Sequence, residues 1–158
     1  MQVFVPFASP YETARCLDKR RLNKQIIEAR QILSAIRKGS GPWAHHPVVL
    51  MWRKHWWWLA CYLRCLVAYQ AGETSIARYE DHYCREYRPD FLTSDFCDQH
   101  KRRLFTKDSA HYVQFAHLGT SDENWYFVDG RLVRYANGKK LDFTEPQGLY
   151  GKTTVNSK

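Results

Sequence analysis

Long hydrophobic runs are missing from this sequence, and so is a recognisable targeting segment. No apolar stretch reaches the ~18 residues that a membrane-spanning helix needs. The start, MQVFVPFASP, lacks the basic and then apolar layout of a secretory signal peptide. The sequence therefore predicts a cytoplasmic protein without a membrane segment.

Cysteine occurs in an odd number and without paired spacing. The five cysteines stand at positions 16, 61, 65, 84 and 97, and none forms a CxxC pair. This pattern argues against both a disulfide framework and a zinc site. The adjacent His45 and His46 have no partner motif of cysteines or carboxylates, so we expect neither a metal nor a cofactor.

Motifs for phosphate cradles and for activated serine are absent. The sequence contains no GxxxxGK[ST], no GxGxxG and no GxSxG. A P-loop, a dinucleotide-binding turn and a nucleophile elbow are therefore not indicated.

Acidic residues are scarce where basic residues are dense. The chain has 24 Lys and Arg against 16 Asp and Glu, a net charge of +8. Residues 19–72 contain ten of these cations, and Glu28 is the one carboxylate among them. A lone glutamate in such a segment is either a surface salt-bridge partner or a group that works in catalysis.

Aromatic residues are abundant, at 15% of the chain with 6 Trp and 10 Tyr. Cations neutralise phosphates and flat rings stack on bases, so this composition favours a nucleic acid as the partner. The alternative is a basic surface around an aromatic core, because composition alone does not separate these uses.

The spacing of apolar residues predicts a mainly α fold in one compact domain, which we expect to be a monomer. Residues 2–7 predict a short extended entry. Ser9 and Pro10 are typical of a helix start, and Gly39 is typical of a helix end. Asp18 and Ser94 are candidate N-caps of later helices. The segment 48–70 is apolar nearly all round and predicts a central buried helix with its tryptophans in the core. Helices are expected from residue 10 and over residues 19–38, 48–70, 73–87, 94–106 and 109–117. In the segment 73–87, one apolar stripe consists of Ile76, Tyr79, Tyr83 and Tyr87.

The C-terminal part changes period and predicts a small antiparallel β meander. Asp129-Gly130 and Asn137-Gly138 are hairpin dipeptides. They separate expected strands over residues 125–128, 131–135 and 139–143. We predict a helical domain over residues 1–120, a meander packed on it over 121–145 and a loose tail over 146–158.

Glu28 lies roughly 200° around its helix from Ile26, on the side opposite the apolar stripe. Its face is polar, with cations one and two turns earlier. The residues that share this face are Arg21, Lys24, Gln25 and Gln31.

Three segments resemble the pyrimidine-dimer DNA glycosylases of the phage endonuclease V type and their relatives. The first is CLDKRRLNKQIIEARQIL at residues 16–33, and the second is His46-Pro47 followed by Trp52. The third has the form His-x-x-x-Leu-x-x-Lys-Asp-x-x-x-Tyr at residues 100–112. The similarity covers residues 1–118.

The resemblance implies a catalytic role for a single glutamate on the first long helix, which is Glu28, preceded by the basic Arg21. In the endonuclease V type, the N-terminal α-amine attacks C1′ of the sugar and forms an imine. An α-amine has a pKa of about 8, well below that of lysine, so it is a better nucleophile near neutral pH. The bulky Gln2 predicts that Met1 is retained, so the reacting amine would belong to Met1. The meander has no counterpart in the all-helical endonuclease V type.

We therefore predict a DNA glycosylase that flips out and excises a damaged or modified base from double-stranded DNA, with the AP lyase step left open. The excised base is a pyrimidine dimer or a hypermodified pyrimidine. The predicted catalytic residues are Glu28, Met1 and Arg21. The residues predicted to contact DNA are Arg20, Lys24, Arg30, Trp43, His45, His46, His100, Lys101, Arg102, Arg103 and Lys107.

Two alternatives remain open at this point. The chain would be a non-catalytic basic DNA-binding module if Glu28 were only a salt-bridge partner. It would be a metal-dependent nuclease if His45 and His46 held an ion, and EDTA would then inhibit it.

Overall fold

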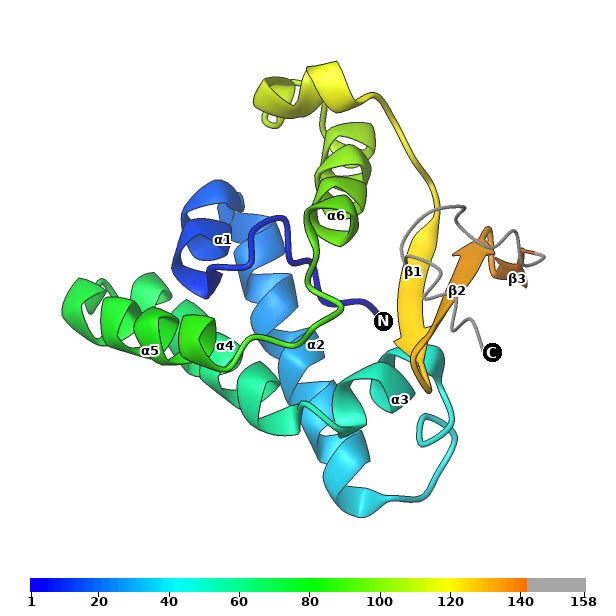
Figure 1. Ribbon diagram of the computed structural model, residues 1–158. Helices are drawn as coiled ribbons and strands as arrows, with labels where there is room; N and C mark the ends of the chain where they lie inside the picture. The colour runs from blue at the N-terminus through cyan, green and yellow to red at the C-terminus, as the bar shows by residue number, and fades with distance from the viewer. Residues whose placement is uncertain (142–158) are drawn as a thin grey trace, which may run out of the picture.

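The computed structural model describes residues 1–141, in which helices enclose one core and a small sheet packs on one side (Figure 1). This confirms the mainly α fold with a small C-terminal antiparallel sheet. The predicted tail 146–158 and the end of the third predicted strand lie outside the described residues. The helices are α1 (Pro10–Cys16), α2 (Lys19–Lys38), α3 (Pro47–Arg53), α4 (Trp56–Gln70), α5 (Thr74–Glu86), α6 (Ser94–Lys107) and the 3-10 helix η1 (Val113–Leu118).

Local capping explains where α2 begins and ends, as predicted. The Asp18 carboxylate accepts the Arg21 backbone N–H, and Gly39 takes the left-handed conformation with φ of 66°. Burial on its own would raise the pKa of Asp18, but hydrogen bonds from Arg21 and Tyr112 outweigh it and lower that pKa to about 2. The cap is therefore charged at neutral pH and also ties α2 to the segment after α6.

The sheet consists of β1 (Asn124–Val128), β2 (Arg131–Ala136) and β3 (Lys139–Lys140), in that order and antiparallel. Asp129 and Asn137 both have φ of 50° and each precedes a glycine of positive φ, which is the geometry of tight hairpin turns. Both predicted turns are confirmed. β1 contacts α3, and its Tyr126 belongs to the same core as the helices.

The predicted helix 48–70 is wrong, because the structure has two helices with a break at Lys54 and His55. The break turns α3 toward β1, whereas α4 packs on α2 and α5. Trp52 and Trp58 stack across it with ring centroids 5.3 Å apart, and both are fully buried. Trp56, however, is 54% exposed, so the expectation of a buried position fails for this tryptophan. Neither proline nor glycine marks the break, which therefore left no signal in the sequence.

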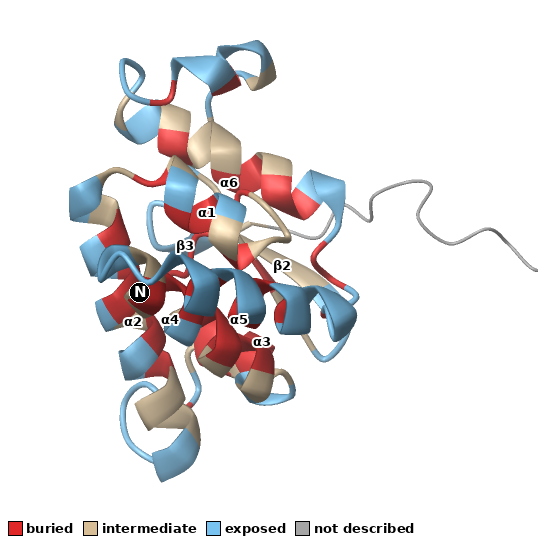
Figure 2. Cartoon of the chain, turned by 90° about the vertical axis from the view of Figure 1, so that its left-hand side faces the viewer, coloured by how far each residue is buried: buried red, intermediate tan, exposed pale blue. Residues whose placement is uncertain are grey.

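The apolar stripe predicted for α5 faces outward instead of into the core. The exposed fraction of the stripe residues ranges from 42% at Tyr83 to 70% at Tyr79. Figure 2 colours much of α5 as exposed. The buried side carries the small Ala77 and Cys84, which allow close packing on α4, and the carboxylate of Asp81. Asp81 accepts hydrogen bonds from the Ser9 hydroxyl at 2.5 Å and from the backbone of Tyr11 at 3.0 Å. A satisfied polar anchor therefore decides the orientation of α5.

The predicted helix 109–117 is replaced by a turn and the shorter η1. Asp108 accepts the backbone N–H of His111 as an N-terminal cap would, but regular structure begins only at Val113. Thr93, one residue before the predicted Ser94, caps α6.

The N-terminal segment is extended, as predicted, and residues 2–6 are buried. Its backbone groups bond to helix side chains, because it joins no sheet. The N–H of Phe4 donates to Gln25 at 2.6 Å, and the N–H of Val5 donates to Nδ1 of His100 at 2.6 Å. The Tyr62 hydroxyl donates to the carbonyl of Phe4 at 2.8 Å. These bonds hold the start of the chain in place.

The buried His100 predicts a loss of stability in mild acid. Burial and the nearby Arg103 lower the pKa of His100 to about 3. Between pH ~6.5 and 3 the unfolded chain takes up a proton that the folded chain refuses, so stability falls as the pH decreases. In urea unfolding, His100→Gln should reduce this slope by up to about 1.4 kcal/mol per pH unit. Gln can still accept the backbone N–H of Val5. An unaltered slope in His100→Gln would contradict this assignment.

Candidate active site and DNA interface

Glu28 projects from the middle of α2 and is mostly covered, with only 12% of its side chain exposed. Its Oε2 accepts a hydrogen bond of 3.1 Å from Nε2 of Gln25. Its Oε1 lies 3.8 Å from Nζ of Lys24, one turn earlier. Gln25 and Glu28 on the polar face of α2 are therefore covered by other parts of the protein, whereas Lys24 and Gln31 on the same face are exposed.

Cations from a distant helix approach the same carboxylate. The pKa of Lys107 is lowered by partial burial and by repulsion from Arg103, Lys24 and Arg21, while Glu28 opposes this. Burial also lowers the pKa of Arg103, which Glu28 again opposes. One carboxylate among several cations creates a region that attracts anions such as phosphates.

The sheet adds an aromatic wall to this region. Burial raises the pKa of Tyr126 to about 12, Arg103 opposes this, and Glu28 adds to the increase. The rings of Tyr126 and His46 meet edge to face with centroids 6.0 Å apart. Tyr126 on β1 therefore lies within electrostatic range of both Arg103 on α6 and Glu28 on α2.

The start of the chain lies beside these groups. Burial and then the positive charge of the N-terminal amine lower the pKa of His46, so this histidine lies close to the amine. In Figure 1 the N-terminus lies between α2 and β1. One amide nitrogen, Nε2 of Gln25, lies 3.3 Å from the carbonyl oxygen of Gln2 and 3.1 Å from Glu28. The second residue of the chain, next to the predicted Met1, is therefore joined to Glu28 through the amide of Gln25.

The predicted catalytic Arg21 is held elsewhere. Its guanidinium pairs with Asp18 at 2.5 Å and with Asp108 at 3.5 Å, and it lies over the ring of Tyr112 at 5.3 Å. Within residues 1–141 it makes no ion pair with Glu28. Arg21 therefore joins α2 to the segment at the end of α6.

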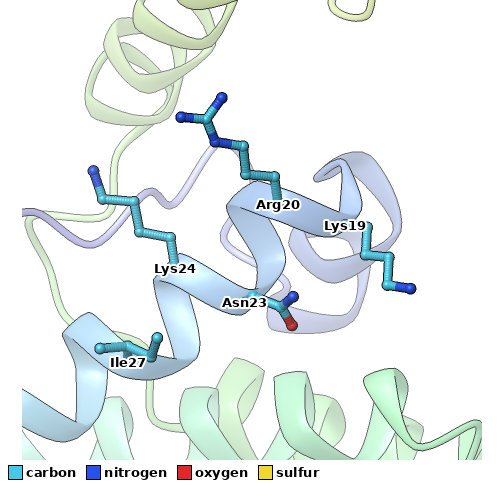
Figure 3. A pocket seen from close by; sticks show the side chains of 5 residues that line it. All are labelled: Lys19, Arg20, Asn23, Lys24 and Ile27. Atoms are coloured by element: carbon cyan, nitrogen blue, oxygen red, sulfur yellow. The ribbon is translucent and has the colours of Figure 1, made fainter.

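The cations of α2 that were predicted to bind DNA are exposed. Arg20, Lys24 and Arg30 all face solvent. Arg20 and Lys24 border a shallow hollow of about 540 Å³ on the outer side of α2 (Figure 3). Its lining consists of Lys19, Arg20, Asn23, Lys24 and Ile27. This surface combines three cations with one apolar side chain.

The loop before α3 presents two further predicted residues. Trp43 is 48% exposed and His45 faces solvent. His46 is half-buried, and its Nδ1 accepts the backbone N–H of Val48 at 3.2 Å as the cap of α3. The ring centroids of Trp43 and His46 lie 5.4 Å apart, so Trp43 extends the site along the loop before α3.

The predicted cluster on α6 is only partly available to DNA. Lys101 pairs with Asp98 at 2.8 Å, and Arg102 donates to the carbonyl of Leu118 at 2.9 Å. Arg103 donates to Asn124 and lies 5.6 Å over the ring of Phe4. Arg102 and Arg103 therefore fasten η1, β1 and the N-terminal segment to α6, whereas the Lys101–Asp98 ion pair lies within α6. Lys107, at the end of α6, is exposed.

His100 is a core residue, so the predicted DNA contact is wrong. It is 1% exposed and accepts the backbone N–H of Val5. The basic run at 100–103 suggested a surface, but α6 turns its first member inward. Sequence reasoning also missed Gln25 and Tyr126 as site residues. Gln25 could have been found from its place on the Glu28 face, whereas Tyr126 enters the site only through the packing of the sheet.

One known protein family matches the N-terminal part of the chain. Residues 1–71 match the pyrimidine dimer DNA glycosylase family. The resemblance drawn from the motifs is thereby confirmed for this glycosylase-like part, which runs from the N-terminus through α4 and includes Glu28. The motif at residues 100–112 and the sheet lie outside the match. Neither the curated proteins nor the solved structures contain a match to the chain.

Two negative findings apply to residues 1–141. No helix there has both the length and the apolar character needed to cross a membrane. No group of three or more His, Cys, Asp or Glu side chains there is arranged to hold a metal ion.

Proposed function

We propose that this protein is a DNA glycosylase that excises a damaged or modified pyrimidine from duplex DNA. The observation that carries the proposal is the approach of the N-terminus to Glu28 among cations. A nucleophilic amine, a carboxylate and a phosphate-attracting surface are the groups that this reaction needs. The match of residues 1–71 to pyrimidine dimer DNA glycosylases supports the same activity.

The reaction that we propose begins at the N-terminal amine. The neutral amine of Met1 attacks C1′, the glycosidic bond breaks, and the base leaves with the bonding electrons and takes up a proton. Glu28 stabilises the positive charge that develops on the sugar and accepts a proton from the attacking nitrogen. The C1′–O4′ bond then breaks, O4′ takes the proton held by Glu28, and the sugar ring opens to an iminium. The iminium loses a proton from C2′ and expels the 3′ phosphate in a β-elimination. If water attacks in place of the amine, Glu28 activates it and the product is an abasic site.

Access to C1′ requires that a nucleotide leaves the base stack. We assign phosphate contacts to the exposed cations Arg20, Lys24, Arg30 and Lys107, with Lys101, Arg102 and Arg103 as an inner border. Trp43, His45 and His46 edge the site from the loop before α3, where they wedge the duplex or line the pocket of the extruded base.

Two classes of base fit this reaction. A pyrimidine dimer and a hypermodified pyrimidine both place a bulky pyrimidine in the pocket. We assign β1 to one side of that pocket, because its Tyr126 packs edge to face on His46. Since the sheet lies outside the matched residues, the family match does not choose between the two bases.

One experiment tests the activity and the base class together. The protein is incubated in EDTA with ultraviolet-irradiated duplex DNA and, separately, with phage DNA that carries modified pyrimidines, each with and without borohydride. We expect base release from one of the two, together with a borohydride-trapped protein–DNA adduct. Release without trapping would assign the water mechanism.

Two results would contradict the proposal. Tight binding without release from either DNA would favour the non-catalytic DNA-binding module. Strand cleavage that EDTA abolishes would favour a metal-dependent nuclease.

A further inference from the structure

Gln25 is a fully buried polar side chain that connects the N-terminal segment to Glu28. Its relative exposure is 0%, although it lies on the polar face of α2. Its Oε1 accepts the N–H of Phe4 at 2.6 Å. Its Nε2 donates to the carbonyl of Gln2 at 3.3 Å and to Oε2 of Glu28 at 3.1 Å. Both polar atoms of the amide are therefore bonded.

The orientation of this amide is dictated by its partners. The backbone N–H of Phe4 can only donate, so the amide oxygen must face it. The nitrogen then faces the other way, where the Gln2 carbonyl and the Glu28 carboxylate can both accept. Because the amide group is planar and rigid, it fixes the position of Gln2 relative to the carboxylate of Glu28.

The other polar contact of Glu28 constrains it far less. Lys24 approaches at 3.8 Å, but 66% of the lysine side chain is exposed. Ion pairs of exposed lysines are weak and mobile because solvent screens them and the side chain loses entropy. A hydrogen bond from a buried amide holds a carboxylate oxygen in a defined place.

We propose that Gln25 is the positioning residue of this site, which holds the Glu28 carboxylate and the N-terminal amine in one reactive arrangement. The inference rests on the proposed glycosylase function. It concerns geometry rather than chemistry, because Gln25 does not itself exchange a proton or form a bond to DNA. A displacement of about 1 Å between reacting groups lowers a rate by roughly 100-fold.

The test compares Gln25→Met with a matched control, Gln99→Met. Gln99 is also a buried glutamine, 2% exposed, and its Nε2 donates to Ser121 at 2.6 Å and to the carbonyl of Glu123 at 2.9 Å. Both variants lose buried amide hydrogen bonds, but only Gln25 contacts Glu28. Single-turnover base release should fall roughly 100-fold in Gln25→Met with the Kd for DNA within about twofold, and Gln99→Met should keep the wild-type rate.

A second variant keeps the test decisive if Gln25→Met does not fold. Gln25→Glu retains an acceptor for the N–H of Phe4, but its ionised carboxylate cannot donate to Glu28. Its base release should decrease, relative to wild type, as the pH rises and the new carboxyl ionises, while circular dichroism shows a folded protein. A purely structural role predicts no such change in the pH profile of a folded variant.

The outcomes separate this inference from the function on which it rests. Wild-type rates in Gln25→Met, or equal losses in Gln25→Met and Gln99→Met, would overturn the positioning role and leave the glycosylase proposal standing. A wild-type protein that releases no base would overturn the proposed function, and the positioning role with it.

Discussion

Replacing Glu28 by glutamine is expected to reduce single-turnover base release by about 10³-fold, because the sugar loses its stabilising carboxylate and the nucleophile loses its proton acceptor. DNA affinity should stay equal or increase, since one negative charge is removed from a cationic surface. Glutamine keeps the size of the side chain and an oxygen that can accept from Gln25. Quenched-flow release assays and fluorescence anisotropy measure the two quantities separately.

The control for this variant is Glu12→Gln. Glu12 lies on the surface of α1 and pairs with Arg15 at 3.1 Å, with 48% of its side chain exposed. The substitution removes the same charge away from the site, so release should be unchanged. Normal release by Glu28→Gln would show that the reaction does not use Glu28 and that the catalytic site lies elsewhere.

Blocking the N-terminal amine should abolish the borohydride-trapped adduct and reduce base release by roughly 100-fold or more. An added Gly-Ser before Met1 moves the amine away from Glu28 and turns the nitrogen of Met1 into an amide without a nucleophilic lone pair. Intact-mass measurement of the unmodified protein should find Met1 retained, as the bulky Gln2 predicts. Trapping and mass analysis of the adduct peptide complete the test.

The matched comparison is a protein extended by the same two residues at its C-terminus, which should behave as wild type. Undiminished base release by the N-terminally extended protein would exclude the amine as nucleophile. The reaction would then use water activated by Glu28, and Glu28→Gln would remain inactive.

Wherever neighbouring residues along the chain decide the conformation, prediction from sequence succeeded. Asp18 and Gly39 delimit α2 because a side-chain cap and a left-handed residue act within one helical turn. Asp129-Gly130 makes its turn because positive φ is tolerated there. The grouping of Glu28 with Gln25 on one face also followed from helical periodicity alone.

Errors arose where packing between distant segments decides. The orientation of α5 depends on Asp81, whose partners Ser9 and Tyr11 are about 70 residues away in the sequence. His100 is turned inward by a backbone N–H at residue 5. Hydrophobic patterning favoured the aromatic stripe of α5 as its buried side, but a satisfied carboxylate and small side chains pack more closely against α4.

The sequence by itself determined the mainly α architecture, the ends of α2 and the two hairpin turns, and it placed Glu28 on the polar face of α2, because each depends on local stereochemistry or periodicity. Only the tertiary structure decided that the N-terminus reaches Glu28, that Gln25 joins them, and that Tyr126 and Arg103 complete the surroundings. These groups come from the chain start, α2, α6 and β1. Their proximity results from burying a common core, and no spacing within one segment encodes it.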